Sequence, residues 1–326
     1  METISRTWTT RIAILFIFRL AVYNCTRSPL VKNYVPSSDQ ARTLFNFNFT
    51  EFFHGRTLYV LGDSTVAAGN FMLAKHPYGV DSKDFSVSGE WLPTARFSNG
   101  YTIADYLAVR MGSSIPRAFH GFLEEEERRR NLGIFIPPAF SAIVEQEKRR
   151  NLGISSPGIN FASAGCGILT RTQQIESLYS IVGARRFIIN NLAPMGCFPD
   201  RKNQSTNICD HVLNRSIGEF NKQLELALRK FKREHDVTIV LADVMKMFFE
   251  IVFNPLEFGF TEVYKPCCGE WNSSMKKFQC EERSHYCKNR NEYFFFDGAH
   301  TTDKANRLFV DNCLAGRVCY PIHAEI

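Results

Sequence analysis

A short apolar run that ends in a Gly-Asp-Ser turn constrains the fold of this chain more than any other feature. Residues 58–61 are Leu-Tyr-Val-Leu, and Gly62, Asp63 and Ser64 follow directly. An apolar run of this length between turn residues is typical of a buried strand, and glycine lets the backbone bend sharply after it. In open α/β sheets, ligands bind beyond the carboxyl ends of the strands. The sequence therefore predicts an α/β fold that presents Ser64 at the ligand-binding edge of its sheet.

A candidate base for Ser64 lies far along the chain. Asp297 and His300 follow an apolar run, and one local turn can present both because they are three residues apart. The imidazole would take the Ser64 proton while the carboxylate holds the ring in the required tautomer. The simpler alternatives are a helix-capping serine and an ordinary loop histidine. The strand context and the Asp-x-x-His pair favour catalysis, with the order Ser, Asp, His.

Five short segments after residue 57 form a series. They are Gly62-Asp63-Ser64, Arg-Phe-Ser-Asn-Gly at 96–100, Gly-Ile-Asn-Phe-Ala-Ser-Ala-Gly at 158–165, Leu-Ala-Pro-Met-Gly-Cys at 192–197 and Asp-Gly-Ala-His at 297–300. In this order they resemble the plant GDSL esterase/lipase family of the SGNH-hydrolase superfamily. One segment alone would be weak support, but five in order are strong.

The resemblance implies a fold and a set of roles. The fold is a three-layer α/β/α flavodoxin-like arrangement with a mostly parallel sheet, and the activity is hydrolysis of carboxylic esters. Ser64 would be the nucleophile, His300 the base and Asp297 the residue that orients it. The backbone N–H groups of Ser64 and Gly165 would form the oxyanion hole. We expect no cofactor and no metal site.

The sequence departs from the family at two places. Ala67 stands where the family usually has an acidic residue, and no Gly-x-Asn-Asp segment is present. In the family, that asparagine donates a side-chain hydrogen bond to the oxyanion. The segment belongs between Gly165 and Leu192, and this interval is too short for the strand and helices that the family carries there. The resemblance therefore leaves room for a sheet with one strand missing.

The missing strand would lie beside the one that delivers Ser64. Unpaired backbone groups in a central position are costly, so either other chain fills the gap or residues 186–191 move into it. We expect the second outcome, with residues 186–191 paired to residues 58–61. Asn190 or Asn191 would then lie near the place of the oxyanion asparagine, depending on register. We do not expect either to restore that function.

The N-terminus resembles a secretory signal peptide. Arg6 and Arg11 precede an apolar run at residues 12–18, which is too short to span a membrane as a helix. Arg19 interrupts the run, and cleavage is expected near residues 23–28. We assign residues 1–25 to the signal peptide and 26–326 to a single hydrolase domain, because 326 residues can bury one large core. The protein is expected to be secreted.

Ten cysteines suit an oxidising compartment. Cys197 and Cys209 flank a polar loop and are expected to pair. The cluster of Cys267, Cys268, Cys280 and Cys287 is expected to pair within itself. A zinc site is the alternative, but Cys267 and Cys268 are adjacent and no paired C-x-x-C spacing exists. Secretion would also make four Asn-x-Ser/Thr sites candidates for glycosylation: Asn48, Asn203, Asn214 and Asn272.

Neither the net charge nor an internal repeat indicates a particular function. A formal charge of +6 is modest for this length, and no segment resembles a nucleic-acid motif, so we expect no nucleic-acid partner, no transmembrane segment and a monomer. Residues 127–134 recur as residues 147–154, which indicates an exposed insertion. A basic binding patch is the alternative, but residues 124–127 nearly cancel its charge.

Apolar spacing predicts the remaining elements. Residues 71–99 should form a loop. Asp243 is a second acidic candidate, although a structural surface role is preferred. Helices are expected at residues 102–111, 212–231 and 302–314, and strands at 159–162, 186–191 and 237–241.

The leading function is a secreted serine ester hydrolase that acts on lipids or on acylated or acetylated compounds. Two alternatives remain. The missing asparagine segment suggests a non-enzymatic binding protein of the same family, and an acyl-enzyme could also pass its acyl group to an alcohol as an acyltransferase.

Overall fold

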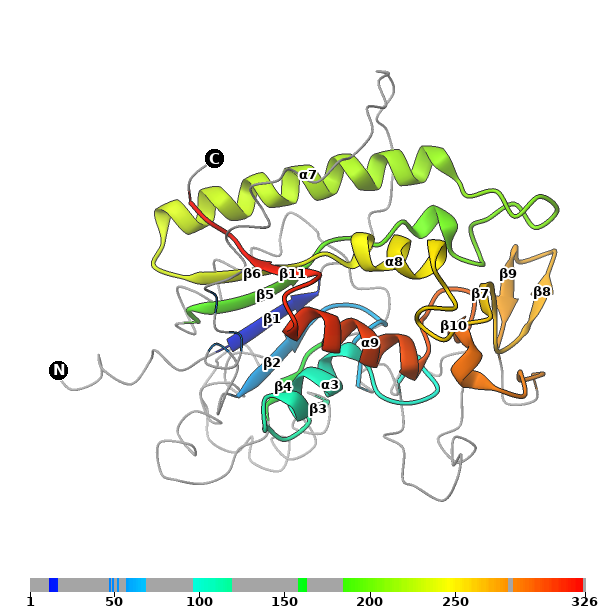
Figure 1. Ribbon diagram of the computed structural model, residues 1–326, viewed down its shortest axis with the longest axis horizontal. Coiled ribbons are helices and arrows are strands. Elements are labelled where there is room, and N and C mark those ends of the chain that lie inside the picture. Colours follow the sequence, from blue (N-terminus) through cyan, green and yellow to red (C-terminus); the bar gives the residue numbers. More distant parts are fainter. Residues whose placement is uncertain are drawn as a thin grey trace, which may run out of the picture.

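The computed structural model describes residues 12–16, 47, 49, 52, 57–68, 96–118, 158–162, 184–280 and 284–324. A seven-stranded sheet with the order β11-β6-β5-β1-β2-β4-β3 forms the centre (Figure 1). Its strands are parallel except for β11, which is antiparallel to β6. The strands are β1 (Ile12–Phe16), β2 (Leu58–Leu61), β3 (Arg117–Ala118), β4 (Ile159–Asn160), β5 (Arg186–Asn190), β6 (Thr238–Ala242) and β11 (Cys319–Pro321).

Helices cover both faces of this sheet. The helix α7 (His211–Glu234) packs on one face, where Leu228 joins a core with Phe187, Ile189 and Ile239. The other face carries α3 (Ile103–Arg110), α8 (Val244–Phe253) and α9 (Asp303–Leu314). Alternate residues of each strand point to opposite faces, so one strand contributes to both cores. The expected three-layer α/β/α architecture with a mostly parallel sheet is confirmed.

Local sequence explains where the helices begin. Thr102 and Asp105 form a reciprocal capping box at the start of α3. Thr302 caps α9, and Asp303 lies in its first turn. The three helices expected from apolar spacing are present within one to three residues of their expected ends.

Asp243 is structural, as expected, but it does not lie on the surface. Its side chain caps α8 by accepting a hydrogen bond from the backbone N–H of Lys246 at 3.0 Å. The residue is only 6% exposed. The expectation of a surface position was wrong because the cap faces the core at the end of β6.

A second region beyond α8 was not anticipated from the sequence. It contains β7 (Glu262–Pro266) paired with β10 (Tyr293–Phe295), and the hairpin β8 (Glu270–Asn272) with β9 (Lys277–Gln279). Two short 3-10 helices, η4 (Met195–Cys197) and η5 (Arg290–Glu292), complete the elements. Short strands bounded by cysteines carry little periodicity, so pattern alone does not identify them.

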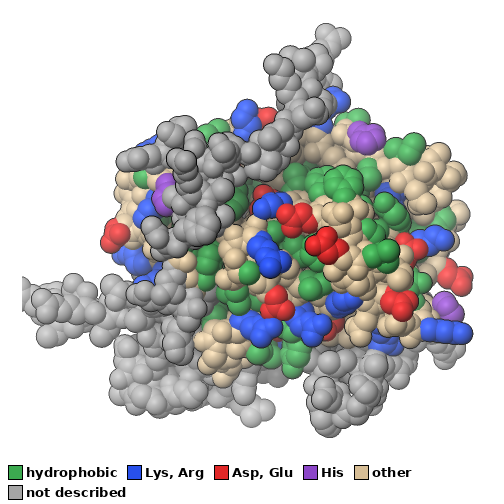
Figure 2. All heavy atoms as spheres, viewed as in Figure 1, with side chains coloured by type: hydrophobic (Ala, Val, Ile, Leu, Met, Phe, Trp, Pro, Cys, Tyr) green, Lys and Arg blue, Asp and Glu red, His purple; other side chains and the backbone are tan. Residues whose placement is uncertain are grey.

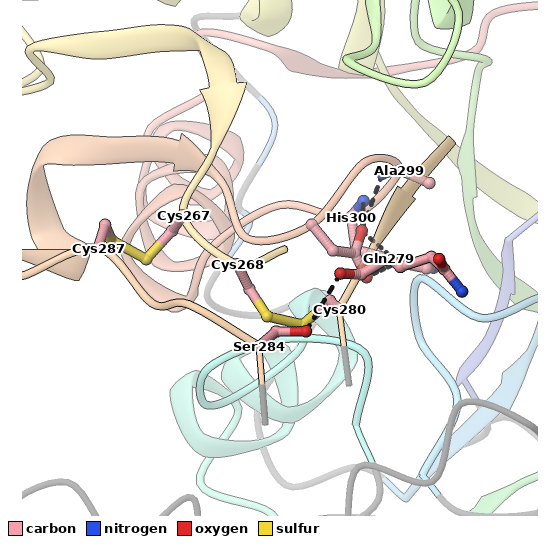
Figure 3. The surroundings of a disulfide bond; sticks show 9 residues. Cys267, Cys268, Gln279, Cys280, Ser284, Cys287, Ala299 and His300 are labelled. Carbon is pink, nitrogen blue, oxygen red and sulfur yellow. Dashed lines mark hydrogen bonds and ion pairs between the residues drawn. A yellow bond between two sulfur atoms is a disulfide. The ribbon is translucent and has the colours of Figure 1, made fainter. Parts of the chain in front are cut away.

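Four disulfides tie these elements together. Cys197 pairs with Cys209, and the cysteine cluster pairs within itself as Cys267–Cys287 and Cys268–Cys280, which confirms both expectations (Figure 3). A further bond, Cys313–Cys319, joins the end of α9 to β11. No group of metal-ligating side chains is found within the described residues.

The central position of the sheet is filled by an unexpected segment. Ile12–Phe16 lies between β2 and β5 and runs parallel to both, with Leu15 level with Leu61 on one side and Ile189 on the other. The expected pairing of residues 186–191 with residues 58–61 is therefore wrong. Strand β5 instead pairs with β1 and β6. An apolar segment can satisfy both neighbours without moving β5 away from β6.

This segment is the apolar run that the sequence assigns to a signal peptide. One molecule cannot use Ile12–Phe16 both as a removed leader and as the strand between β2 and β5. The described helices include none that is long and apolar enough to cross a membrane. Removal of the N-terminal residues would therefore leave β2 and β5 without the strand that lies between them, and this should lower the stability of the fold.

Glycine explains the close approach at the other side of β2. A Cβ atom on Gly158 would lie 1.7 Å from the carbonyl oxygen of Leu58. Only glycine lets the start of β4 lie this close to β2, and Val60 then pairs with Asn160.

On the face shown in Figure 2, charged side chains of both signs lie around and between apolar side chains. Phe253 and Leu256, at and just beyond the end of α8, are 74% and 77% exposed. Several expected features lie outside the described residues: most of the loop at 71–99, the duplicated segments at 127–134 and 147–154, Asn48 and Gly165.

Removing the N-terminal segment should destabilise the fold. We expect a chain of residues 26–326 and the full chain carrying Ile14→Pro to melt at least about 5 °C below the full chain, because both remove backbone pairing at a central strand. Ile14→Val should stay close to the full chain, since it keeps a strand-forming apolar residue. Thermal melts followed by circular dichroism measure this, and equal midpoints for all four proteins would contradict the role of β1.

Candidate active site

Ser64 lies in the tight turn that directly follows β2. The Oδ1 atom of Asp63 accepts hydrogen bonds from the backbone N–H of Thr65 at 2.9 Å and from its hydroxyl at 2.7 Å. The side chain of Asn160 joins this turn to the end of β4, because its Nδ2 donates to the carbonyl of Val66 at 2.7 Å. The serine is therefore held on a braced turn at the carboxyl edge of the sheet.

The structure brings Ser64, His300 and Asp297 into one hydrogen-bonded chain. The Nε2 atom of His300 lies 2.8 Å from Ser64 Oγ, although the two residues are 236 positions apart. The other ring nitrogen, Nδ1, lies 2.8 and 2.9 Å from the two carboxylate oxygens of Asp297. This is the order of contacts that lets a histidine accept a serine proton while a carboxylate orients the ring.

A local turn preorganises the acid and the base. Asp297 Oδ1 also accepts the backbone N–H groups of Ala299 and His300, both at 2.8 Å. The backbone N–H of Phe296 donates to the carbonyl of His300 at 2.8 Å and closes the loop. The spacing of three residues thus fixes the carboxylate against the imidazole before any substrate arrives.

The neighbouring charges shift the two pKa values in opposite directions. Burial alone would lower the pKa of His300, but the carboxylate of Asp297 outweighs it and raises the pKa above its usual value. Burial alone would raise the pKa of Asp297, but the charge and hydrogen bonds of His300 lower it below its usual range. The pair therefore favours an ionised carboxylate beside an imidazole of increased basicity.

The segment at residues 96–100 supports the histidine, a role that sequence reasoning left unassigned. The ring of Phe97 stacks on the ring of His300 with centroids 4.8 Å apart. Ser98 Oγ donates to the carbonyl of Thr301 at 3.2 Å, and Asn99 Oδ1 accepts from the backbone N–H of Asp303 at 3.0 Å. The segment thus holds the loop from one side.

An ion pair and a glycine seat that segment. Arg96 lies 2.8 Å from Asp105, and both side chains are almost fully buried. A Cβ atom on Gly100 would lie 2.4 Å from the carboxylate of Asp303, so only glycine fits there. Each residue of the Arg-Phe-Ser-Asn-Gly motif therefore makes a contact that positions this segment or the loop beside it.

The disulfide region holds the loop from the other side. The backbone N–H groups of Cys267 and Cys268 donate to the carbonyls of Phe295 and Phe296 at 3.0 and 2.7 Å. Figure 3 shows the two bridges of this cluster, and Cys280 lines the same cavity as His300. Oxidised cysteines therefore brace the strand that leads into the Asp297 turn.

Asp200 is a partly buried acid that sequence reasoning did not identify. Its backbone N–H donates to the carbonyl of Gly298 at 3.0 Å, and its Oδ1 accepts from the backbone N–H of Phe278 at 2.7 Å. A Cβ atom on Gly298 would lie 1.8 Å from Asp200 Oδ1. Burial, together with the nearby charge of Asp297, raises the pKa of Asp200 to about 6. Sequence reasoning missed Asp200 because it lies three positions after the segment at residues 192–197 and in none of the five segments.

Only one of the two residues expected to form the oxyanion hole belongs to the described part of the chain. Ser64 is described, whereas Gly165 lies outside the described residues. Asn191 is occupied elsewhere, because its Nδ2 donates to Asp243 at 2.7 Å and its Oδ1 accepts from Met245 N–H at 3.2 Å. Ala67, at the position where the resemblance implied an acidic residue, is fully buried in the core.

A cavity of about 1060 Å³ opens beside the serine. Ser64, Asp297 and His300 line it together with many aromatic side chains, among them Phe198, Phe248 and Phe294. Such a cavity suits the apolar part of a substrate, with the polar chemistry confined to one wall.

The described glycosylation candidates differ in how free their amides are. Asn203 is exposed, and its Oδ1 accepts two backbone N–H groups while it forms a turn. The Nδ2 atoms of Asn214 and Asn272 donate to Cys197 Sγ and Gln279 Oε1. A glycan attaches at Nδ2, so Asn203 is the best placed of these three.

The acid–base pair makes a direct prediction for titration. We expect the ring of His300 to titrate above the ordinary value of about 6.5 in the full chain. In Asp297→Asn the pKa of His300 should fall, because burial remains and the largest compensating charge is lost. NMR of ring nitrogens, assigned with His300→Gln, measures this, and exposed Asp210→Asn is the control. A pKa that stays unchanged in Asp297→Asn would contradict the coupling.

Asp200 should give the protein a pH-dependent stability. Since its folded pKa is raised to about 6, the folded state holds this proton more tightly than the unfolded chain. The contribution is present below about pH 4 and lost as pH rises through about 6. The melting temperature of Asp200→Asn should therefore gain on that of the natural chain between pH 4.5 and 7.5. Exposed Asp236→Asn should show a constant difference, and the same constancy in Asp200→Asn would disprove the shift.

Comparison with known proteins finds similarity to one family of hydrolases. The GDSL-like Lipase/Acylhydrolase family matches residues 167–312. GDSL esterase/lipase At5g22810 of Arabidopsis thaliana is 26% identical over 80% of this chain and 89% of its own length. GDSL esterase/lipase At5g55050 is 26% identical over 81% and 86%, and GDSL esterase/lipase APG is 32% identical over 41% and 39%, both from the same plant. The chain is therefore similar to plant GDSL esterase/lipases.

Proposed function

We propose that this protein is a serine hydrolase of carboxylic esters, with Ser64 as nucleophile, His300 as general base and Asp297 as the residue that orients His300. The single observation that carries the proposal is the 2.8 Å contact between His300 Nε2 and Ser64 Oγ. It is backed by the contact of Nδ1 with Asp297. A capping serine or an ordinary loop histidine would have no reason to form this chain of contacts.

The reaction follows from the geometry. Ser64 Oγ attacks the ester carbonyl carbon while His300 Nε2 takes the hydroxyl proton, and the carbonyl electrons move to the oxygen. The C–O bond to the alcohol then breaks, and the alcohol leaves with the proton from His300. Water repeats the sequence on the acyl-enzyme and releases the carboxylic acid. The backbone N–H groups of Ser64 and Gly165 are proposed to stabilise the oxyanion.

The absent Gly-x-Asn-Asp segment predicts a slow enzyme rather than an inactive one. Loss of one oxyanion donor costs roughly 10²- to 10³-fold in rate in a well-studied protease. The serine, base and orienting acid do not depend on that donor for their geometry. We therefore keep hydrolysis ahead of a purely binding role. An acyltransferase would share the first half of the reaction and differ only in the acceptor.

The substrate and the compartment follow from the cavity and the cysteines. An aromatic-lined cavity beside Ser64 favours lipids or other acylated compounds with an apolar part. Four disulfides within the described residues favour passage through an oxidising compartment. We propose secretion on this basis, with a monomeric protein and no nucleic-acid partner.

A fluorophosphonate probe tests the nucleophile directly. We expect it to label the natural chain at Ser64, because the probe reacts with an activated serine. Ser64→Ala should lose the label and at least about 10³-fold of the hydrolysis rate on 4-nitrophenyl acetate. Ser216→Ala, an exposed serine on α7, should keep both.

Two results would overturn this proposal. One is labelling that persists in Ser64→Ala, which would place the reactive serine elsewhere. The other is a natural, fully oxidised chain that takes up no probe and releases no product above the rate of Ser64→Ala. Adding short alcohols as acceptors separates hydrolase from acyltransferase by the products formed.

A further inference from the structure

One buried side chain in the cavity has no hydrogen-bond partner. Asn190, the last residue of β5, is 1% exposed, and neither its Oδ1 nor its Nδ2 meets a partner within the described part of the chain. Buried amides are nearly always paired. Its neighbours follow that rule, since the amides of Asn160 and Asn191 are both hydrogen-bonded. An unpaired amide at this depth is therefore a candidate contact for a ligand.

The position of Asn190 ties it to the active site. It lines the same cavity as Ser64 and His300. In the sheet, Leu15 of β1 pairs with both Leu61 and Ile189. Asn190 is thus level with the residue that follows Leu61, at the carboxyl edge where Ser64 stands. The amide faces the reaction space rather than the opposite core.

The sheet also places Asn190 too far away to contact the oxyanion. Strand β1 separates β2 from β5, so two strand spacings, about 10 Å, lie between their backbones. A hydrogen bond spans only about 3 Å. The amide can therefore meet a substrate group several bonds from the reacting carbonyl, while the carbonyl itself stays at Ser64.

The acyl part of the ester is the part that points toward this amide. The alcohol must leave past His300 Nε2, which protonates it, and Phe97 stacks on that ring. The acyl group then occupies the remaining cavity. Its walls include Phe198, Phe248 and Phe294, and Phe248 contacts the other two at centroid distances of 6.1 and 5.6 Å. Aromatic walls favour a flat ring between the carbonyl and the amide.

We propose that Asn190 selects esters whose acyl group carries an aromatic ring with a hydrogen-bonding substituent, such as a hydroxyl, remote from the carbonyl. This rests on the proposed ester hydrolysis and names its substrate class. A site built to hydrogen-bond a hydroxyl rejects the analogue that lacks it, because the amide would stay unpaired. A purely apolar acyl group would leave both atoms of the amide without partners.

The test compares two esters that differ by one hydroxyl: 4-nitrophenyl 3-phenylpropanoate and 4-nitrophenyl 3-(4-hydroxyphenyl)propanoate. We expect the natural chain to favour the hydroxylated ester at least about tenfold in kcat/KM. Asn190→Leu, close in size but without polar atoms, should lose this preference, with the larger fall in kcat/KM on the hydroxylated ester. Exposed Asn254→Leu is the matched control and should keep the preference.

A stability measurement separates recognition from a structural role. If Asn190 only supported the fold, Asn190→Leu would lower the melting temperature. We expect the melting temperature to stay level or rise, because an unpaired buried amide is replaced by an apolar side chain. An equal fall in rate on both esters, or a natural chain without preference, would overturn the proposal.

Binding to Ser64→Ala keeps the test independent of catalysis. Calorimetry with 3-(4-hydroxyphenyl)propanoate and 3-phenylpropanoate should show tighter binding of the hydroxylated acid, and the double variant Ser64→Ala, Asn190→Leu should lose that difference. If no ester is hydrolysed but this difference is present, the proposed hydrolysis fails and the assignment of Asn190 stands. If esters are hydrolysed without any difference between the two acids or esters, the assignment of Asn190 fails alone.

Discussion

The backbone of β2 must be hydrogen-bonded on both sides, and the rest of the molecule depends on how this is achieved. Ser64 is delivered by the end of that strand, so a gap beside it would leave the nucleophile on a poorly supported edge. On one side Gly158 lets β4 approach closely. On the other side Ile12–Phe16 lies between β2 and β5. A segment from the far N-terminus therefore supports the centre of the sheet, and its removal would affect the site through the strand that carries it.

The catalytic loop has a different kind of support. Asp297 and His300 face Ser64 from a turn that belongs to no strand of the large sheet. Phe97 packs against the imidazole, and the segment around it bonds to the start of α9. The disulfide-bonded Cys267 and Cys268 hold the preceding strand from the opposite side. Reduction of these bridges would therefore loosen the acid–base pair before it loosened the nucleophile.

The sequence was sufficient where the determinants are local. The apolar run before Ser64, the single turn that presents both Asp297 and His300, and the helix expected at residues 302–314 each depend on interactions within a few residues, and the structure contains all three. The occupant of the central strand position could not be predicted, because an apolar run such as residues 12–16 has the same composition in a leader peptide and in a buried strand. The burial of Asp200 and the unpaired amide of Asn190 depend on neighbours distant in sequence, so neither had a local signal.

The two carboxyl groups of Asp297 and Asp200 lie near His300, and their surroundings shift their pKa values in opposite directions. Asp297 accepts two backbone N–H groups and the ring of His300, which together outweigh burial and keep it ionised. Within the described residues, the carboxylate of Asp200 accepts one hydrogen bond, from the backbone N–H of Phe278, and burial raises its pKa to about 6. Both acids raise the pKa of His300, but Asp200 does so only when ionised. Asp63 raises the pKa of His300 as well. As pH rises through about 6, the charge of Asp200 is added to those of Asp297 and Asp63, so the basicity of His300 itself depends on the protonation state of Asp200.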